Sequence, residues 1–384
     1  MTLPARIRSF YFLYFVGIGI NLPFFAPYLR GLGFSGRQIG TAQMIGALTA
    51  APAGIIWAVV TDRLRAATPA LRLATTGVLC AAFLLPWVHT PATVAAVLVL
   101  QGLSMPAITP LVDSLAVETA RATHTSYSRL RLFGSLGYVA GALLLGVALT
   151  ARGDRPGDPL VPLALLACAI GYAVTAAGFP RTQAAGVGPH PSAMLGLLRD
   201  RTLLWVLAAG VLHTICTVPY YQLFGVLVRE HGLSAAVTGT GSTVGVLAEI
   251  GVLLLYPRLE QRFSTGTLLA TAFLAGAVRW SLLSIASSAT AIIALQALHG
   301  LTFGLYWAAT IKIMSRIVPP ALRTTGQALY GAVSFSVGGA IGSQLSGICY
   351  DAFGAAAPVY RLAAIGELLP FGIALLLRAR DRSV

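Results

Sequence analysis

The chain of 384 residues is 57% hydrophobic and only 10% charged, with a mean hydropathy of +0.80. This composition excludes a soluble globular protein, because there is too little polar surface to cover one. The net charge of +14 comes from Arg and Lys residues placed between hydrophobic runs, so we interpret it as a topology signal and expect no nucleic-acid partner.

Twelve apolar runs divide the sequence, and each is long enough to cross a bilayer as a helix. We therefore predict an all-α membrane protein with both termini on the same side. The first run exceeds the core of a signal peptide and is expected to remain as a helix. The predicted spans are 7-29, 38-60, 71-88, 93-116, 132-150, 159-179, 202-228, 236-256, 267-286, 291-314, 327-349 and 358-377.

Positive residues are distributed unequally between the two sets of loops, and this predicts the orientation. Nineteen Arg and Lys residues lie in loops on the side of the N-terminus, six lie on the other side, and Arg279 lies inside a span. Because positive loops are retained in the cytoplasm, both termini are expected there, with the chain crossing the inner (cytoplasmic) membrane many times.

The longest loop, residues 180-201, is rich in Pro and Gly. We interpret it as a cytoplasmic linker that separates an N-terminal six-helix bundle, 1-179, from a C-terminal six-helix bundle, 202-384.

The two bundles show an internal repeat. Arg-x-x-Gly-x-Ser occurs at Arg30 and again at Arg229, an offset of 199 residues. A second match, of Phe133-Gly134 with Tyr330-Gly331, has an offset of 197 residues. Two matches at equivalent positions in the halves indicate a parallel repeat.

Three ionisable residues, Glu249, Arg279 and His299, lie inside consecutive spans of the second half. An arginine inside a bilayer costs at least roughly 2.5 kcal/mol, so it should face a partner or a wet cavity. At about 1.5 Å of rise per residue, Glu249 lies roughly 8 Å deeper than the other two, and a long arginine side chain can cover much of that gap. We predict a proton-coupling site in which Glu249 carries the proton, Arg279 controls its ionisation and His299 is a relay or ligand; a structural ion pair is the alternative.

Asp113 lies near the cytoplasmic end of the fourth span, and Arg129 and Arg131 open the fifth. A buried carboxylate normally has a cationic partner, so we interpret these residues as a structural ion pair, with a direct role in transport as the alternative. Glu367, inside the twelfth span, has no partner that the sequence identifies.

Polar and aromatic residues inside other spans are candidates for the wall of a solute cavity. Aromatic rings with few polar groups would suit a small, partly apolar solute, although anchors at the membrane interface have the same composition. The predicted substrate-binding residues are Asn21, Gln43, Tyr138, His213, Tyr220, Tyr306, Trp307 and Gln344.

The sequence offers no sign of catalytic or cofactor chemistry. Its four cysteines are isolated in apolar runs and are interpreted as packing residues. The short loops hold no cluster of acidic, His or Ser residues, and no Walker A motif is present. We expect no catalytic residue, no metal and no cofactor, which argues against an integral membrane transferase, the alternative from a different class.

Four motifs carry a family resemblance, namely Pro106-x-x-x-Pro110-x-x-Asp113, Tyr127-x-Arg129-x-Arg131-x-x-Gly134-Ser135, LHGLTFG from Leu298 to Gly304, and Gln327-Ala328-Leu329-Tyr330. The chain resembles the major facilitator superfamily and is most similar to the phenylpropionic acid permease group, near the lactose permease and nucleoside symporters. The resemblance covers all twelve spans and implies two halves that rock about a central cavity. The lactose permease also places acid, arginine and histidine on its eighth to tenth helices. Phe303 lies one turn after His299, where a second acid is missing, so that proton path cannot be copied in full.

The leading hypothesis is a secondary active transporter that couples protons to the import of a small organic solute by alternating access. The resemblance favours an aromatic carboxylate, with a sugar or a nucleoside as alternatives. A proton-antiporting exporter of drugs or metabolites is the second hypothesis, because no motif fixes the direction. The expected partners are the solute, protons and the lipid bilayer, and we expect a monomer.

The orientation can be tested by labelling with an impermeant thiol reagent in a cysteine-free background. In intact cells, Ala185→Cys in the expected cytoplasmic linker should be protected, whereas Ala235→Cys in a loop on the opposite side should react. Labelling of the cysteine at position 185 from outside the cell would overturn the orientation.

Overall fold

The computed structural model describes residues 2–64, 66–180 and 191–381. Within these ranges the chain is helical and has no strand, and twelve helices have the length and composition needed to cross a membrane. The prediction of an all-α protein with twelve spans is therefore confirmed. The first six spans are α1 (Leu3–Gly31), α2 (Gly36–Leu64), α3 (Ala67–Leu84) continued by η1 (Leu85–Trp87), α4 (Pro91–Ala122), α5 (Tyr127–Ala151) and α6 (Leu160–Ala177).

The last six spans include three that are interrupted. The tenth and eleventh each contain a π-helical turn, η3 and η5, and the twelfth is broken at Glu367. The elements are α7 (Pro191–Leu197), α8 (Arg201–Glu230), α9 (Ala235–Arg262), α10 (Thr265–Leu283), α11 (Ala289–Leu295), η2 (Gln296–Leu298), η3 (Gly300–Leu305), α12 (Tyr306–Ile317), η4 (Pro320–Leu322), α13 (Arg323–Tyr330), η5 (Gly331–Val337), α14 (Gly338–Phe353), α15 (Ala356–Gly366) and α16 (Leu368–Asp381).

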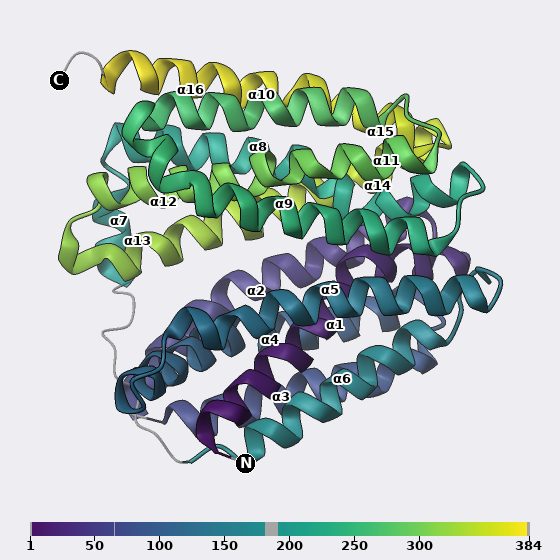
Figure 1. Ribbon diagram of the computed structural model, residues 1–384, viewed down its shortest axis with the longest axis horizontal. Coiled ribbons are helices and arrows are strands. Elements are labelled where there is room, and N and C mark those ends of the chain that lie inside the picture. The colour runs from purple at the N-terminus through teal and green to yellow at the C-terminus, as the bar shows by residue number, and fades with distance from the viewer. Residues whose placement is uncertain (1, 65, 181–190, 382–384) are drawn as a thin grey trace.

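Each half buries its own apolar core, and the two six-helix bundles form separate layers in Figure 1. Phe10 is central in one N-terminal cluster and Trp280 in one C-terminal cluster, and both are fully buried. Of the expected linker, residues 181–190 lie outside the described residues, and the remainder contains α7. Because the buried residues of each core come from one half, the halves can move relative to each other without disrupting either core.

The halves contact each other at the distal side, by which we mean the membrane side opposite the two termini. Asp351, at the end of α14, accepts the N–H groups of Gly36 and Arg37, each at 2.7 Å. The first N–H groups of a helix lack partners within it, so a carboxylate is favourable there. The N-terminus of α2 is thus capped by a residue from the other half.

An equivalent cap runs in the opposite direction. Asp154, which follows α5, accepts the N–H of Ala235 at the start of α9 at 2.9 Å. Asp154 and Asp351 are 197 residues apart, and Gly36 and Ala235 are 199 apart, which are the two offsets of the sequence repeat. Two equivalent interactions therefore close the distal side, as a parallel repeat predicts.

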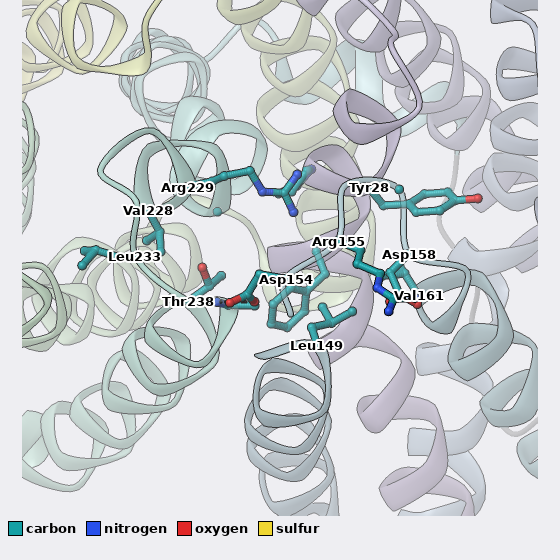
Figure 2. A pocket seen from close by; sticks show the side chains of 15 residues that line it. Tyr28, Leu149, Asp154, Arg155, Asp158, Val161, Val228, Arg229, Leu233 and Thr238 are labelled. Carbon is teal, nitrogen blue, oxygen red and sulfur yellow. Dashed lines mark hydrogen bonds between the residues drawn. The ribbon is translucent and has the colours of Figure 1, made fainter. Parts of the chain in front are cut away.

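A small cavity of 40 Å³ remains between the halves at this closure. Figure 2 shows Tyr28 and Asp154 of the N-terminal half and Arg229 of the C-terminal half around it. Next to it Arg152 donates to Asp158 at 2.9 Å, and this hydrogen bond holds the pKa of the Asp158 carboxyl below its usual value. The cavity has room for water and none for an organic solute.

On the side of the termini the halves diverge, as the left part of Figure 1 shows. A cavity of 460 Å³ lies between α2 and α4 of one half and α13 and η5 of the other. It adjoins a cavity of 360 Å³ between α1, α2 and α4, and Ala50 and Pro106 line both. The structure is therefore closed on the distal side and open on the side of the termini.

Replacing Asp351 by alanine should weaken the distal closure, because the first N–H groups of α2 lose their carboxylate. Hydrogen bonds to charged groups contribute about 1.5–3 kcal/mol each, so the population open on the distal side should rise roughly tenfold or more. The measurement is the rate at which an impermeant thiol reagent labels Gln43→Cys from the distal side. Asp158→Ala is the matched control, because Asp158 bonds Arg152 and Leu160 of its own half. Equal labelling rates in the two variants would contradict this role of Asp351.

Candidate functional site

Arg279 on α10 is fully buried and is held by neutral groups. Its guanidinium donates to the side-chain oxygen of Gln296 at 2.6 Å and to the hydroxyl of Thr302 at 2.9 Å. It also lies 4.4 Å from the centroid of the Tyr220 ring, in a cation–π contact. Within the described residues Arg279 makes no ion pair, and its Nε has no hydrogen-bond partner. The site therefore contains a cation without a counter-charge in contact.

His299, between η2 and η3, connects Arg279 to Glu249. Nη1 of Arg279 lies 3.1 Å from Nδ1 of His299. Because a guanidinium only donates, Nδ1 accepts, and the hydrogen of the neutral imidazole is on Nε2. Nε2 lies 3.9 Å from Oε2 of Glu249, beyond hydrogen-bond distance. The order across the site is arginine, neutral histidine, glutamate.

This order corrects part of the sequence-based interpretation. The sequence makes Glu249 the candidate partner of Arg279, but the structure places His299 between them. The reason is the close packing of the tenth span on α9, where a Cβ at Gly245 would lie 3.3 Å from Cβ of His299. Likewise, a Cβ at Gly304 would lie 3.2 Å from Cγ of Glu249. The glycines allow the imidazole to occupy the space that the arginine would need.

Glu249 is the accessible member of the row, with 23% of its side chain exposed against 9% for His299. Glu249 is therefore partly open to its surroundings, whereas Arg279 lies wholly in the interior.

Asp113 of α4 pairs with Arg131 of α5 at 3.7 Å and accepts the hydroxyl of Tyr11. The guanidinium of Arg131 also lies 4.3 Å from the centroid of the Phe15 ring. Both members of the pair are 31% exposed at the side chain, so they are more accessible than a buried clamp would be. Arg129 is exposed, and in the described part of the chain it makes no ion pair, so the predicted structural pair consists of Asp113 and Arg131 alone.

Two of the predicted substrate-binding residues, Asn21 and Gln43, line the 360 Å³ cavity, together with Gln101, which is not among the predicted residues. Gln101 is a polar residue in the fourth span, so the same rule of polar residues inside spans could have identified it. Gln43 also accepts a hydrogen bond from Gln222 of the other half. The polar wall of this cavity is therefore a set of amides.

The remaining predicted substrate-binding residues are partly exposed, lie in the contact between the halves, or are buried. Tyr138 and Trp307 are partly exposed. Gln344 accepts the hydroxyl of Thr41 at 2.9 Å and so belongs to the contact between α2 and α14.

The structure buries the other three inside the C-terminal half and not on a cavity wall, and their role in substrate binding stays a prediction. They are His213, Tyr220 and Tyr306, at 2%, 5% and 2% exposure. Tyr220 covers Arg279, and Tyr306 bonds Tyr330. Sequence position alone cannot separate an interior face from a cavity face when both are flanked by apolar residues.

These features define a class of protein. Two six-helix bundles with separate cores enclose cavities that are open on one side, and ionisable groups lie within the spans, as expected of a secondary transporter. A family model described as the MFS_1 like family matches residues 5–362, and the chain belongs to this family of major facilitator superfamily transporters. It is a multi-pass membrane transporter of small solutes and not an enzyme.

Relatives and solved structures agree with this assignment. The chain is 28% identical over 358 residues to a protein of Escherichia coli (strain K12) described as a probable 3-phenylpropionic acid transporter, with 90% of each chain covered. It is 25% identical to the maltose permease of Geobacillus stearothermophilus, with 97% of this chain and 94% of the relative covered. The crystal structure of the nucleoside transporter NupG matches with a TM-score of 0.81 at 14% identity, covering 98% of this chain and 99% of that one. The last likeness shows the fold.

The Asp113–Arg131 pair can be tested by Asp113→Asn. If the pair is structural, the variant should lose roughly 1 kcal/mol of stability, because the pair is partly exposed, and should melt a few degrees lower with unchanged solute affinity. The measurements are thermal unfolding in detergent and equilibrium solute binding. A variant that keeps its melting temperature and loses solute binding would assign the pair to transport instead.

Proposed function

We propose that the protein is a proton-coupled symporter of a small organic anion, in which Glu249 carries the proton. The observation that carries the proposal is the row of Arg279, neutral His299 and partly exposed Glu249. It combines a carboxyl group open to solvent with a buried cation that lacks a counter-charge. The halves around it have the arrangement needed for alternating access.

The row supports coupling because its members respond to the charge on Glu249. When Glu249 is ionised, the Nε2–H of His299 can donate to it if the 3.9 Å gap closes, and the charge of Arg279 favours that closure. When Glu249 is protonated, that attraction is lost and α9 is free to separate from the tenth span. A proton therefore changes which arrangement of the helices is stable, which is the requirement for coupling.

His299 is better suited to sensing the proton than to relaying it. Its Nδ1 accepts from Arg279, so a second proton on the ring would require that hydrogen bond to break. Within the proposal, His299 therefore acts as a ligand whose hydrogen bond depends on the ionisation state of Glu249. Of the two roles predicted from the sequence, relay or ligand, we propose the second.

The solute class follows from the charge and the rings near the site. A carboxylate would be attracted by the uncompensated positive charge of Arg279, and the ring of Phe303 stacks on His299 with centroids 5.5 Å apart, while Tyr138 and Trp307 offer partly exposed rings on other parts of the spans. The E. coli relative is described as a transporter of 3-phenylpropionic acid, which has both features. We therefore propose an aromatic carboxylate as the solute and import as the direction, and antiport would appear as the opposite sign of proton movement.

The proposal includes a monomer in the inner membrane with both termini in the cytoplasm. In that orientation the side of the termini is cytoplasmic, so the cavities of 460 and 360 Å³ open inward and the caps at Asp154 and Asp351 close the outer side. The structure then represents the inward-open state of the transport cycle.

Glu249→Gln keeps the shape of the side chain and removes its ionisation. We expect it to reduce the accumulation of 3-phenylpropionate driven by a pH gradient in proteoliposomes roughly tenfold or more, while exchange of solute at equal concentrations continues. Glu260→Gln is the matched control, because Glu260 also lies on α9 but bonds Lys312 at 2.9 Å. If Glu249→Gln accumulates solute at the rate of the control, Glu249 does not carry the proton.

A further inference from the structure

His213 of α8 and Glu367, between α15 and α16, form a second pair of ionisable residues in the C-terminal half. Nδ1 of His213 lies 2.9 and 3.0 Å from the two carboxyl oxygens of Glu367, and the side chains are 3% and 0% exposed. The indole N–H of Trp280 on α10 also donates to this carboxyl group, at 3.3 Å. One carboxyl group therefore joins the seventh, ninth and twelfth spans.

The number of protons in the pair follows from the third contact of His213. Its Nε2 lies 3.0 Å from the main-chain carbonyl oxygen of Thr302, which can only accept, so Nε2 carries a hydrogen. Nδ1 then either donates to an ionised Glu367 or accepts from a protonated one. In both arrangements one proton is shared between Nδ1 and the carboxyl group, and the pair has no net charge.

The contact with Thr302 explains how the pair stabilises the tenth span. Thr302 lies in η3, a π-helical turn, and such turns shift the main-chain hydrogen bonds so that some carbonyl groups need other partners. His213 supplies a donor to the carbonyl of Thr302, while the hydroxyl of the same residue accepts from Arg279 at 2.9 Å. Thr302 thus connects the His213–Glu367 pair to the cation of the candidate site.

Arg279 is connected to the pair by a second route. Trp280, the next residue on α10, bonds Glu367, and its ring lies 4.6 Å from the guanidinium of Arg279. The other titratable groups around the pair are Cys216 of α8 and Tyr306 of α12, whose ring centroid lies 4.3 Å from that of His213. The position of the guanidinium therefore depends on Thr302 and Trp280, and both depend on the pair.

We propose that His213 and Glu367 are positioning residues for Arg279. They form an uncharged clamp that fixes Thr302 and Trp280, and the clamp keeps its single proton throughout the transport cycle. This inference rests on the proposed role of Arg279 beside Glu249. It assigns the coupled proton to the partly exposed carboxyl group of Glu249 and not to the buried carboxyl group of Glu367.

Glu367→Gln distinguishes a clamp from a proton carrier. The amide can donate to Nδ1 of neutral His213 and accept from Trp280, so every hydrogen bond and the zero net charge persist. We expect the variant to accumulate 3-phenylpropionate within about twofold of the wild-type rate and with an unchanged pH profile. If accumulation against a gradient is lost while exchange continues, the pair releases its proton during transport and the clamp is refuted.

Glu367→Leu removes the clamp and tests its link to Arg279 without any solute. The measurement is thermal unfolding of Glu367→Leu, Arg279→Gln and the double variant in detergent. If the clamp positions Arg279, the decreases in melting temperature of the two single variants are not additive. The double variant then melts at a higher temperature than the sum of the two decreases predicts. In proteoliposomes the single variant should also show a displaced pH profile, because Arg279 no longer has its place beside His299.

Glu230→Leu is the matched control for this cycle. Glu230 also joins α8 to later spans, through the hydroxyl of Tyr350 at 2.9 Å and the N–H of Ala356 at 3.0 Å. Its effect on the melting temperature should add to that of Arg279→Gln and leave the pH profile unchanged. Additive losses for Glu367→Leu as well would refute the positioning role.

Two further outcomes can be separated from these. If Glu367→Leu does not fold, the stability cycle is measured with Trp280→Phe and Thr302→Val instead. Trp280→Phe removes the N–H donor to Glu367 and keeps an aromatic ring. Additive losses of stability in this second cycle would count against the clamp. If the wild-type protein does not take up 3-phenylpropionate, the proposed solute is wrong, and the stability cycle still decides the inference.

Discussion

The burial of one positive charge inside the membrane is the constraint on which the C-terminal half depends. A buried cation is stable only when hydrogen-bond acceptors or a counter-charge surround it. Arg279 is surrounded by an amide oxygen, a hydroxyl, an imidazole nitrogen and an aromatic face. These groups come from α8, η2 and the segment around η3, so the three must meet at one place. The π-helical turn and the glycines on which it packs provide that meeting place.

The two halves are built differently around the space between them. The N-terminal half presents a partly exposed pair, Asp113 with Arg131, whereas the C-terminal half keeps most of its polar network inside. The closure between the halves includes carboxylate caps at two helix N-termini, and opening of the distal side must exchange these caps for water. The buried residues of each apolar core come from one half, and Ala235 of α9 packs against the edge of an N-terminal core. Rocking therefore changes the caps and the surroundings of Glu249 and leaves the packing of each bundle intact.

Much of this organisation can be predicted from the sequence, because hydropathy determines the spans and the repeat determines how the halves correspond. The sequence also identifies Glu249, Arg279 and His299, since ionisable residues inside apolar runs are rare. Their order could not be predicted, because it depends on how closely the tenth span packs on α9 at Gly245 and Gly304. The pairing of His213 with Glu367 could not be predicted from the sequence either, since 154 residues separate them and no spacing rule links the seventh span to the twelfth. The domain boundaries and the assignment of the site to proton coupling stay predictions.

The measurement that tests the central claim most directly is proton movement during solute entry. Lightly buffered proteoliposomes with a trapped pH indicator and a clamped membrane potential receive 3-phenylpropionate, and protein-free liposomes give the rate of passive permeation. The account predicts acidification of the lumen above that passive rate for the wild-type protein, and solute entry without such acidification for Glu249→Gln. Proton entry that persists in Glu249→Gln, or solute entry through the wild-type protein without protons, would contradict it.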